Sequence, residues 1–197
     1  MRNKDGIYFS PNYRFLNLRW NDRENLLCAF KDRIYGFYFS PAAQLNQNKH
    51  AFASGMICLS LIDLFSKLQN DTSGVRKRYV PWLETNIKDF NSTNPDNQSE
   101  TLAKRFYDEF RNCLIHECRI KNAGQFSYIY PRIIHLMTDS NRHIMIINPK
   151  FLLFALEKSF ENYISVIESN NEEFLKFRQI IKDNFFTDFE CVKEGIE

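Results

Sequence analysis

The sequence predicts a mainly α-helical fold with one small β-hairpin. Apolar residues recur at helical spacing along most of the 197 residues, whereas residues 125–148 read as two short strands around a polar turn. Hydrophobic residues make up 44% of the chain, and the 19 Phe and 9 Tyr can fill a substantial core without a metal or a disulfide. We therefore expect an N-terminal arm over 1–21 and one helical domain over 22–197.

The first helix of that domain is expected over about 22–39. Either Asn21 or Asp22 can cap its N-terminus, because a short polar side chain accepts a hydrogen bond from the first helical turn. Ser40-Pro41 follows, and a proline inside a helix removes a backbone donor. The sequence thus predicts that the first helix ends at this dipeptide.

A longer helix is expected over about 42–69. It carries apolar residues on two opposite sides, a pattern typical of a central helix. Asp63 falls among the apolar residues of the side that includes Phe52, and a buried acid requires a partner. That partner can be an arginine or a helix cap; alternatively, Asp63 can orient the groups of a functional site.

Loops and shorter helices follow up to residue 124. A turn is predicted over 70–74, and a short helix over about 79–90 that begins near Pro81. A polar loop covers 91–99, where Asn97 with Glu100 resembles a capping box. The helix that it opens is expected to run to about Cys118, with the segment 122–124 as its stop.

The C-terminal third combines the hairpin with two helices. The hairpin appendage covers about 125–148, and its loop is expected at 138–141, which would place His143 opposite Leu136. His143 and His135 are interpreted as structural or surface residues. The C-terminal helices are expected over 149–185, the first of them over 149–169.

Charge and cysteine content narrow the range of functions. Residues 151–197 hold 5 Lys/Arg and 10 Asp/Glu, whereas the whole chain has a net charge of +2. Residues 1–150 are therefore basic, which favours the binding of a polyanion such as RNA. The 5 Cys include no C-x-x-C pair and are expected to be reduced. No signal-peptide pattern is visible, and Met56–Leu64 is too short to span a bilayer, so we expect a cytoplasmic protein without membrane contact.

Three residues of the helix that ends near Cys118 form the candidate catalytic group. Asn112 and His116 are four residues apart and share a face. Arg111 lies about 140° around the helix from His116 and about 7.5 Å along it. One helix therefore does not bring the two together, and either the reach of the arginine or a second subunit has to complete the site.

These residue types suit metal-independent cleavage of RNA by attack of the ribose 2′-hydroxyl. His116 can act as acid or base, Arg111 can stabilise the phosphoryl charge, and Asn112 can orient the imidazole or bind phosphate. No metal or cofactor is required. Arg119 and Lys121 can contact RNA phosphates, or can be solvated charges at the helix end. The alternative for His116 is a histidine that packs beside the core.

The same segment resembles HEPN domains. Their R-x(4–6)-H motif with a polar residue after the arginine matches Arg111-Asn112-Cys113-Leu114-Ile115-His116, and the residues that follow, up to Lys121, also resemble some HEPN branches. The resemblance covers about 22–120 and the helix over 149–169, and it leaves out the hairpin. One branch carries a modified tyrosine where this chain has Cys118, so we do not expect control by that modification.

The resemblance implies a helical bundle that forms a homodimer around a shared cleft, with Arg111 and His116 catalytic and Asn112 supportive. Many such proteins are RNases of toxin–antitoxin or antiviral defence systems, so RNA is the expected substrate and an antitoxin protein a further expected partner. Two other classes stay open: a non-catalytic HEPN-like module that binds RNA or nucleotide or dimerises, and a helical protein-interaction domain.

Overall fold

The computed structural model describes residues 7–69, 74–139 and 142–194. The fold is mainly α-helical with small sheets, as the sequence predicts. The chain divides into two units, of which one combines residues 1–41 with 160–197 and the other spans 42–159.

The first unit begins with two short strands and a helix. The strands β1 (Tyr8–Ser10) and β2 (Tyr13–Arg14) pair antiparallel and are followed by the 3-10 turn η1 (Phe15–Asn17). Helix α1 (Arg23–Ile34) begins where predicted, because the Asp22 carboxylate accepts a hydrogen bond from the Asn25 N–H at 3.0 Å.

The core of this unit is aromatic. The rings of Phe30 and Phe177 lie 5.0 Å apart between centroids, and those of Phe9 and Phe185 lie 5.2 Å apart. Phe177 and Phe185 belong to helix α8 (Asn171–Glu194), which extends beyond the predicted end at residue 185.

The predicted break at Ser40-Pro41 is wrong. Helix α1 passes through the π turn η2 (Tyr35–Phe39) directly into α2 (Ser40–Gln47), and the Ser40 N–H donates to the Tyr35 carbonyl. A π turn bonds residues five apart, and Pro41 has no N–H to donate. The wider turn therefore accommodates the proline without ending the helix.

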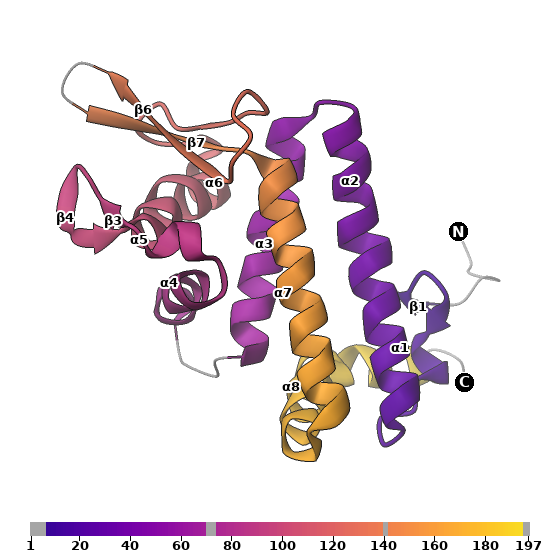
Figure 1. The fold of residues 1–197 in the computed structure, drawn as a ribbon. Coiled ribbons are helices and arrows are strands. Elements are labelled where there is room, and N and C mark those ends of the chain that lie inside the picture. The colour runs from indigo at the N-terminus through magenta and orange to yellow at the C-terminus, as the bar shows by residue number, and fades with distance from the viewer. Residues whose placement is uncertain (1–6, 70–73, 140–141, 195–197) are drawn as a thin grey trace. The chain divides into compact units, whose positions relative to one another are not determined.

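The second unit contains every residue of the predicted site. Most of its helices and strands are labelled in Figure 1. After α2, most of which belongs to this unit, its helices and strands in chain order are α3 (Ala51–Gln69), α4 (Val75–Asn86), η3 (Lys88–Asn91), β3 (Thr93–Asn94), β4 (Asn97–Thr101), α5 (Leu102–Phe106), η4 (Tyr107–Arg111), α6 (Asn112–Glu117), β5 (Gln125–Phe126), β6 (Ile134–Asp139), β7 (Arg142–Ile147) and α7 (Pro149–Ser169). Helix α3 packs against α4, and α4 against α5.

Two helix boundaries in this unit differ from the prediction. The helix expected over 42–69 is interrupted before α3, where Lys49 adopts a positive φ of 62°. Helix α4 begins at Val75 and contains Pro81 in its interior instead of its first turn. Of the predicted turn over 70–74, residues 70–73 lie outside the described residues.

The helix that carries the predicted site begins later than expected. Asn97 lies in β4, and the cap is Thr101, whose hydroxyl accepts a hydrogen bond from the Lys104 N–H at 3.3 Å. The end near Cys118 is confirmed, but Cys118 itself supplies the left-handed residue, with a φ of 54°.

The predicted hairpin is confirmed, and its predicted register is wrong. Strand β7 pairs antiparallel with β6 and also parallel with the short β5, which gives a three-stranded sheet. His143 lies opposite Thr138 and not opposite Leu136, because β6 continues to Asp139, where it pairs with Arg142. His135 and His143 are therefore not neighbours across the strands.

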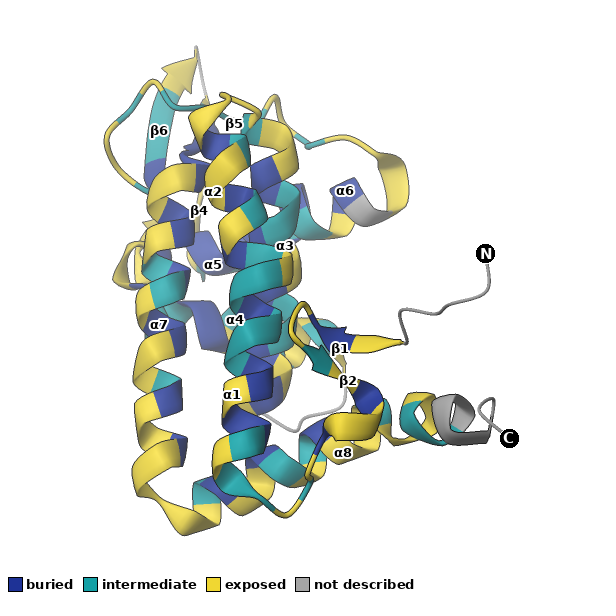
Figure 2. Cartoon of the chain, turned by 90° about the vertical axis from the view of Figure 1, so that its right-hand side faces the viewer, coloured by how far each residue is buried: buried dark blue, intermediate teal, exposed yellow. Residues whose placement is uncertain are grey.

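Helix α7 has the predicted bounds. Its first turn is capped by the Asn148 side chain, which accepts a hydrogen bond from the Lys150 N–H at 3.0 Å. Buried and exposed positions alternate along this helix (Figure 2). This pattern is that of an amphipathic helix that covers a core.

Helix α3 is the one helix among the described residues that is long and apolar enough to cross a membrane. Half of its most apolar 18-residue window is buried inside the structure. Phe52, expected in the core, is 51% exposed, whereas Cys58, Leu61 and Ile62 are fully buried. The buried residues of α3 fall within about half of its circumference, so this helix buries one side and not the two opposite sides expected of a central helix.

Candidate active site

The continuous helical segment from Leu102 to Glu117, composed of α5, η4 and α6, positions the predicted site residues. Its buried face includes Phe106, Phe110 and Cys113, which are at most 1% exposed. The π turn η4 ends at Arg111, and from there the backbone is α-helical through Glu117. Arg111 and His116 therefore remain about 140° apart around the axis, as the sequence predicts.

Arg111 reaches across to α3, where it binds Asp63. Its Nε and Nη2 donate to the same carboxylate oxygen of Asp63, at 3.0 and 2.8 Å. Arg78 Nη2 lies 3.8 Å from the other oxygen. The prediction that Asp63 pairs with an arginine is confirmed, and this pairing fixes the direction of the Arg111 side chain.

Two tyrosines line the side of this ion pair. The Arg111 guanidinium carbon lies 5.8 Å from the ring centroid of Tyr107, and the Tyr107 and Tyr79 rings meet edge to face at 5.3 Å. Burial, reinforced by the charge of Asp63, raises the pKa of Tyr79 well above its ordinary value. Both effects favour the neutral form of the Tyr79 hydroxyl.

Asn112 and His116 both lie on the exposed side of α6. Within the part of the chain that the structure describes, no hydrogen bond or ion pair joins the His116 ring to another residue, and none joins it to Arg111. The alternative that His116 packs beside the core is therefore wrong. The structure brings Arg111 to Asp63 and leaves the imidazole open to solvent.

Arg119 and Lys121 both bind Glu117. The carboxylate accepts from Arg119 Nε at 2.8 Å and lies 3.1 Å from Lys121 Nζ. Hydrogen bonds from Lys121 and then Arg119 lower the pKa of Glu117 below its usual range. All three side chains are more than a third exposed, so these cations can exchange the carboxylate for a ligand at little energetic cost.

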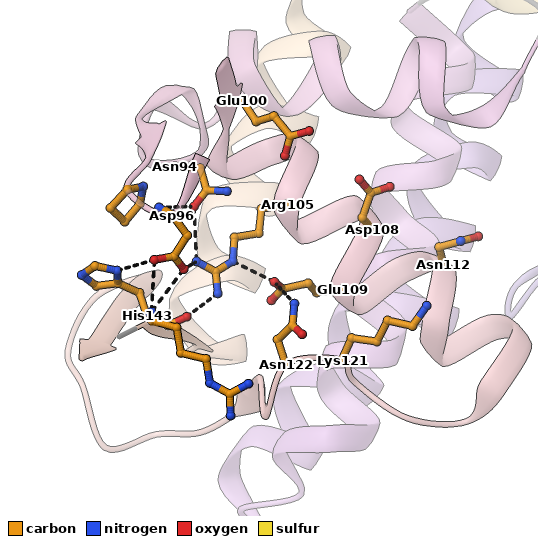
Figure 3. Close-up of a pocket in the computed structure, with 12 residues that line it drawn as sticks. Asn94, Asp96, Glu100, Arg105, Asp108, Glu109, Asn112, Lys121, Asn122 and His143 are labelled. Carbon is orange, nitrogen blue, oxygen red and sulfur yellow. Dashed lines mark hydrogen bonds and ion pairs between the residues drawn. The ribbon is translucent and has the colours of Figure 1, made fainter. Parts of the chain in front are cut away.

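A polar hollow, which the sequence did not predict, opens beside Asn112. It has a volume of about 840 Å³ and is bounded by the β3–β4 hairpin, the helix from Leu102 to Glu117, the segment 121–122 and the start of β7 (Figure 3). Asn112 and Lys121, both predicted site residues, lie on its wall, and Arg111 and His116 do not. We call this cavity the Arg105 hollow.

Arg105 forms the buried base of the hollow and is 5% exposed. Its Nε donates to Glu109 at 2.9 Å, its Nη1 donates to Asp96 at 2.8 Å, and its Nη2 donates to the His143 carbonyl. A buried arginine requires this number of acceptors, because each unpaired N–H would lose its hydration without compensation. The network ties the β3–β4 hairpin to the helix and to β7.

Asp96 also binds the imidazole of His143. The His143 Nδ1 lies 2.7 Å from a carboxylate oxygen of Asp96, and the backbone N–H of His143 donates to both oxygens. Partial burial acts to raise the pKa of Asp96, but the hydrogen bonds from His143 and the charge of Arg105 outweigh it, so the pKa lies below its usual range.

One part of this network had a signal in the sequence. Arg105 and Glu109 are four residues apart on a helix, a spacing that favours an ion pair. Asp96 and His143 are 47 residues apart, and the predicted register of the hairpin misplaced His143. Helical spacing alone therefore could not bring them together.

Comparison with known proteins identifies no relative. No protein-family model, no curated protein and no solved structure matches the chain. Among the residues that the structure describes, no three His, Cys, Asp or Glu side chains are grouped so that they could hold a metal ion. The groups that the candidate site offers for chemistry are the imidazole of His116, the guanidinium of Arg111 and the amide of Asn112.

Proposed function

We propose that the chain is a metal-independent endoribonuclease of the HEPN type, with His116 as acid and base, Arg111 as the stabiliser of phosphoryl charge and Asn112 as the group that positions them. The observation that carries this proposal is the exposure of Asn112 and His116 one turn apart on α6, directly after an arginine that is held in place. A substrate backbone can reach both exposed side chains.

The proposed reaction is transesterification. The ribose 2′-oxygen bonds to phosphorus while the bond to the 5′-oxygen breaks; the 2′-hydroxyl proton passes to a base, and the leaving 5′-oxygen receives a proton. An imidazole can perform either transfer because it titrates near neutrality. Exposure of the His116 ring is the condition for this role, since a sealed ring could not touch the ribose.

Asp63 supports the role proposed for Arg111. It binds Nε and Nη2, and no hydrogen bond of Nη1 occurs within the described residues. A guanidinium fixed on one edge retains a donor for the phosphoryl oxygens. Asp63 is therefore proposed as a positioning residue, and Arg119 and Lys121 as groups that contact the RNA phosphates.

The angle between Arg111 and His116 supports a homodimer. The α-helical backbone from Arg111 to Glu117 keeps the two side chains about 140° apart, so one copy does not direct both at a single phosphate. We propose that two copies form a shared cleft, in the cytoplasm, and that an antitoxin protein controls the activity. Light scattering that shows a monomer at high concentration would remove the basis for a shared cleft.

A non-catalytic RNA-binding or dimerisation module is the second candidate. The observation that favours it is that Asp63 already neutralises the charge of Arg111, which a nuclease needs for the phosphoryl oxygens. Such a module would use Arg119 and Lys121 for salt-sensitive binding of RNA. It would not need the imidazole of His116.

The test incubates purified protein with total RNA in EDTA. We compare the wild type with His116→Ala and Arg111→Lys, and use His50→Ala as a matched control, because His50 is also exposed and lies outside the site. Cleavage that survives EDTA, is lost in both site variants and persists in the control supports the nuclease. Intact RNA with salt-sensitive binding supports the module. If the protein neither cleaves nor binds RNA, the result supports a helical protein-interaction domain.

A further inference from the structure

The Arg105 hollow has a wall rich in hydrogen-bond acceptors. Asp108, Glu109 and Asn112 line it, all from one helix (Figure 3). Asp108 is 44% exposed, and its ion pair, with Arg76, is long at 3.8 Å. This carboxylate is therefore accessible to a ligand that carries N–H donors.

Glu109 provides an independent indication of a ligand. It is 6% exposed, and its Oε1 accepts from Arg105 at 2.9 Å and from Asn122 at 2.7 Å. Its Oε2 is buried and has no hydrogen-bond partner within the described residues. A buried acceptor without a partner is unfavourable, and a donor from a ligand that reaches it would satisfy it.

The hollow also offers a donor to a ligand. Lys121 lies on the wall and is 41% exposed, and its ionic partner within the described residues is the exposed Glu117. The lining of the hollow thus includes both carboxylates and an ammonium group. Its volume of about 840 Å³ lies within the range of about 300–1,000 Å³ that is usual for small-molecule sites.

We propose that the Arg105 hollow binds the base of an RNA nucleotide beside the phosphate that is cleaved, and that it favours guanine. This inference rests on the proposed function, because Asn112 belongs both to the hollow and to the proposed catalytic group. It adds to that function a selectivity for the base.

The preference for guanine follows from its hydrogen-bonding edges. Its N1–H and its 2-amino group present two neighbouring donors to one carboxylate, here that of Asp108, which is 44% exposed. Its O6 and N7 are acceptors that suit an ammonium group such as that of Lys121. Uracil offers a single N–H between two carbonyl oxygens, which a carboxylate repels. Adenine and cytosine offer an amino group without a neighbouring N–H.

The experiment measures the binding of the four nucleoside 5′-monophosphates by calorimetry, without any cleavage step. We expect the wild type to bind GMP at least 10-fold more tightly than UMP. Asp108→Asn keeps the size of the side chain but replaces one acceptor oxygen by an NH₂ group, and is expected to remove most of that preference. Glu172→Gln, an exposed acid of α8, is the matched control and should bind like the wild type.

The outcomes separate this inference from the nuclease proposal. Selective GMP binding that Asp108→Asn abolishes supports the hollow as a base site even when the protein cleaves no RNA. RNA cleavage with equal affinity for GMP and UMP, or with a preference that Asp108→Asn leaves intact, overturns the base site and retains the nuclease. No binding of any nucleotide at millimolar concentration also overturns it.

Discussion

Replacement of Arg111 by alanine is predicted to destabilise the protein through Asp63. The substitution removes both hydrogen bonds to one Asp63 oxygen, at 3.0 and 2.8 Å, and leaves Arg78 at 3.8 Å as the remaining cation. The Asp63 side chain is only 26% exposed, so water replaces the lost partner incompletely. The carboxylate is therefore left partly desolvated and poorly paired.

The magnitude follows from the burial of the pair. Removal of one partner from a fully buried ion pair costs about 3–5 kcal/mol, whereas an exposed pair contributes about 0–1 kcal/mol. The Arg111 and Asp63 side chains are 15% and 26% exposed, nearer to the buried case. We expect Arg111→Ala to lower the free energy of unfolding by about 2 kcal/mol, which in a chain of this length lowers Tm by about 4–8 °C.

Circular dichroism during thermal unfolding measures this effect, with Arg119→Ala as the matched control. Arg119 binds Glu117 with both side chains more than a third exposed, so its loss should change the free energy of unfolding by no more than about 0.5 kcal/mol. In an Asp63→Asn background, Arg111→Ala should destabilise less, by about 1 kcal/mol. Equal Tm values for Arg111→Ala and Arg119→Ala would refute the reasoning.

Three further predictions concern packing, backbone and pH. Gly55→Ala places a methyl group 2.5 Å from the Phe126 ring, and should lower the free energy of unfolding in urea by about 1–3 kcal/mol. Cys118→Gly removes a side chain from a residue with a φ of 54°, and should raise that free energy by up to about 1 kcal/mol. The pKa of Asp96 is depressed in the folded protein, so the stability that its carboxylate contributes is complete above the unfolded pKa of 3.8. That contribution is lost as the pH falls through the folded pKa. The Asp96→Asn variant should therefore be less stable than the wild type at pH 7, and the difference in stability should shrink at lower pH. Denaturation at several pH values checks this, and a constant difference contradicts it.

Strong periodicity and local capping made part of the fold predictable. Helix α7 has the expected bounds because its apolar spacing is regular and Asn148 caps its first turn. The prediction that the helix ends at Ser40-Pro41 is wrong because the π turn η2 allows the helix to continue. A π turn inserts one residue into a helical repeat, and a shift of one residue is too small to recognise in a mixed apolar sequence.

The candidate site was predictable where its contacts run along one helix or follow from burial. The position of Asp63 among apolar residues indicated a charged partner, and the partner is Arg111. The network around Asp96 and His143 depends on the register of a hairpin and on the placement of a polar loop. A shift of strand register moves each side chain to a new neighbour, so composition alone could not predict this network.

The helix from Leu102 to Glu117 holds two arginines that stability alone does not explain. Arg105 is 5% exposed and Arg111 is 15% exposed, and each requires carboxylates from other elements. Apolar residues of similar volume are often at least as stabilising as such buried pairs, which need good geometry to offset desolvation. The two networks also converge on the same short helix, where Asn112 and His116 are exposed. Rigid orientation of this helix toward a charged ligand accounts for both arginines, because a fixed guanidinium or amide needs no reorganisation when charge develops beside it.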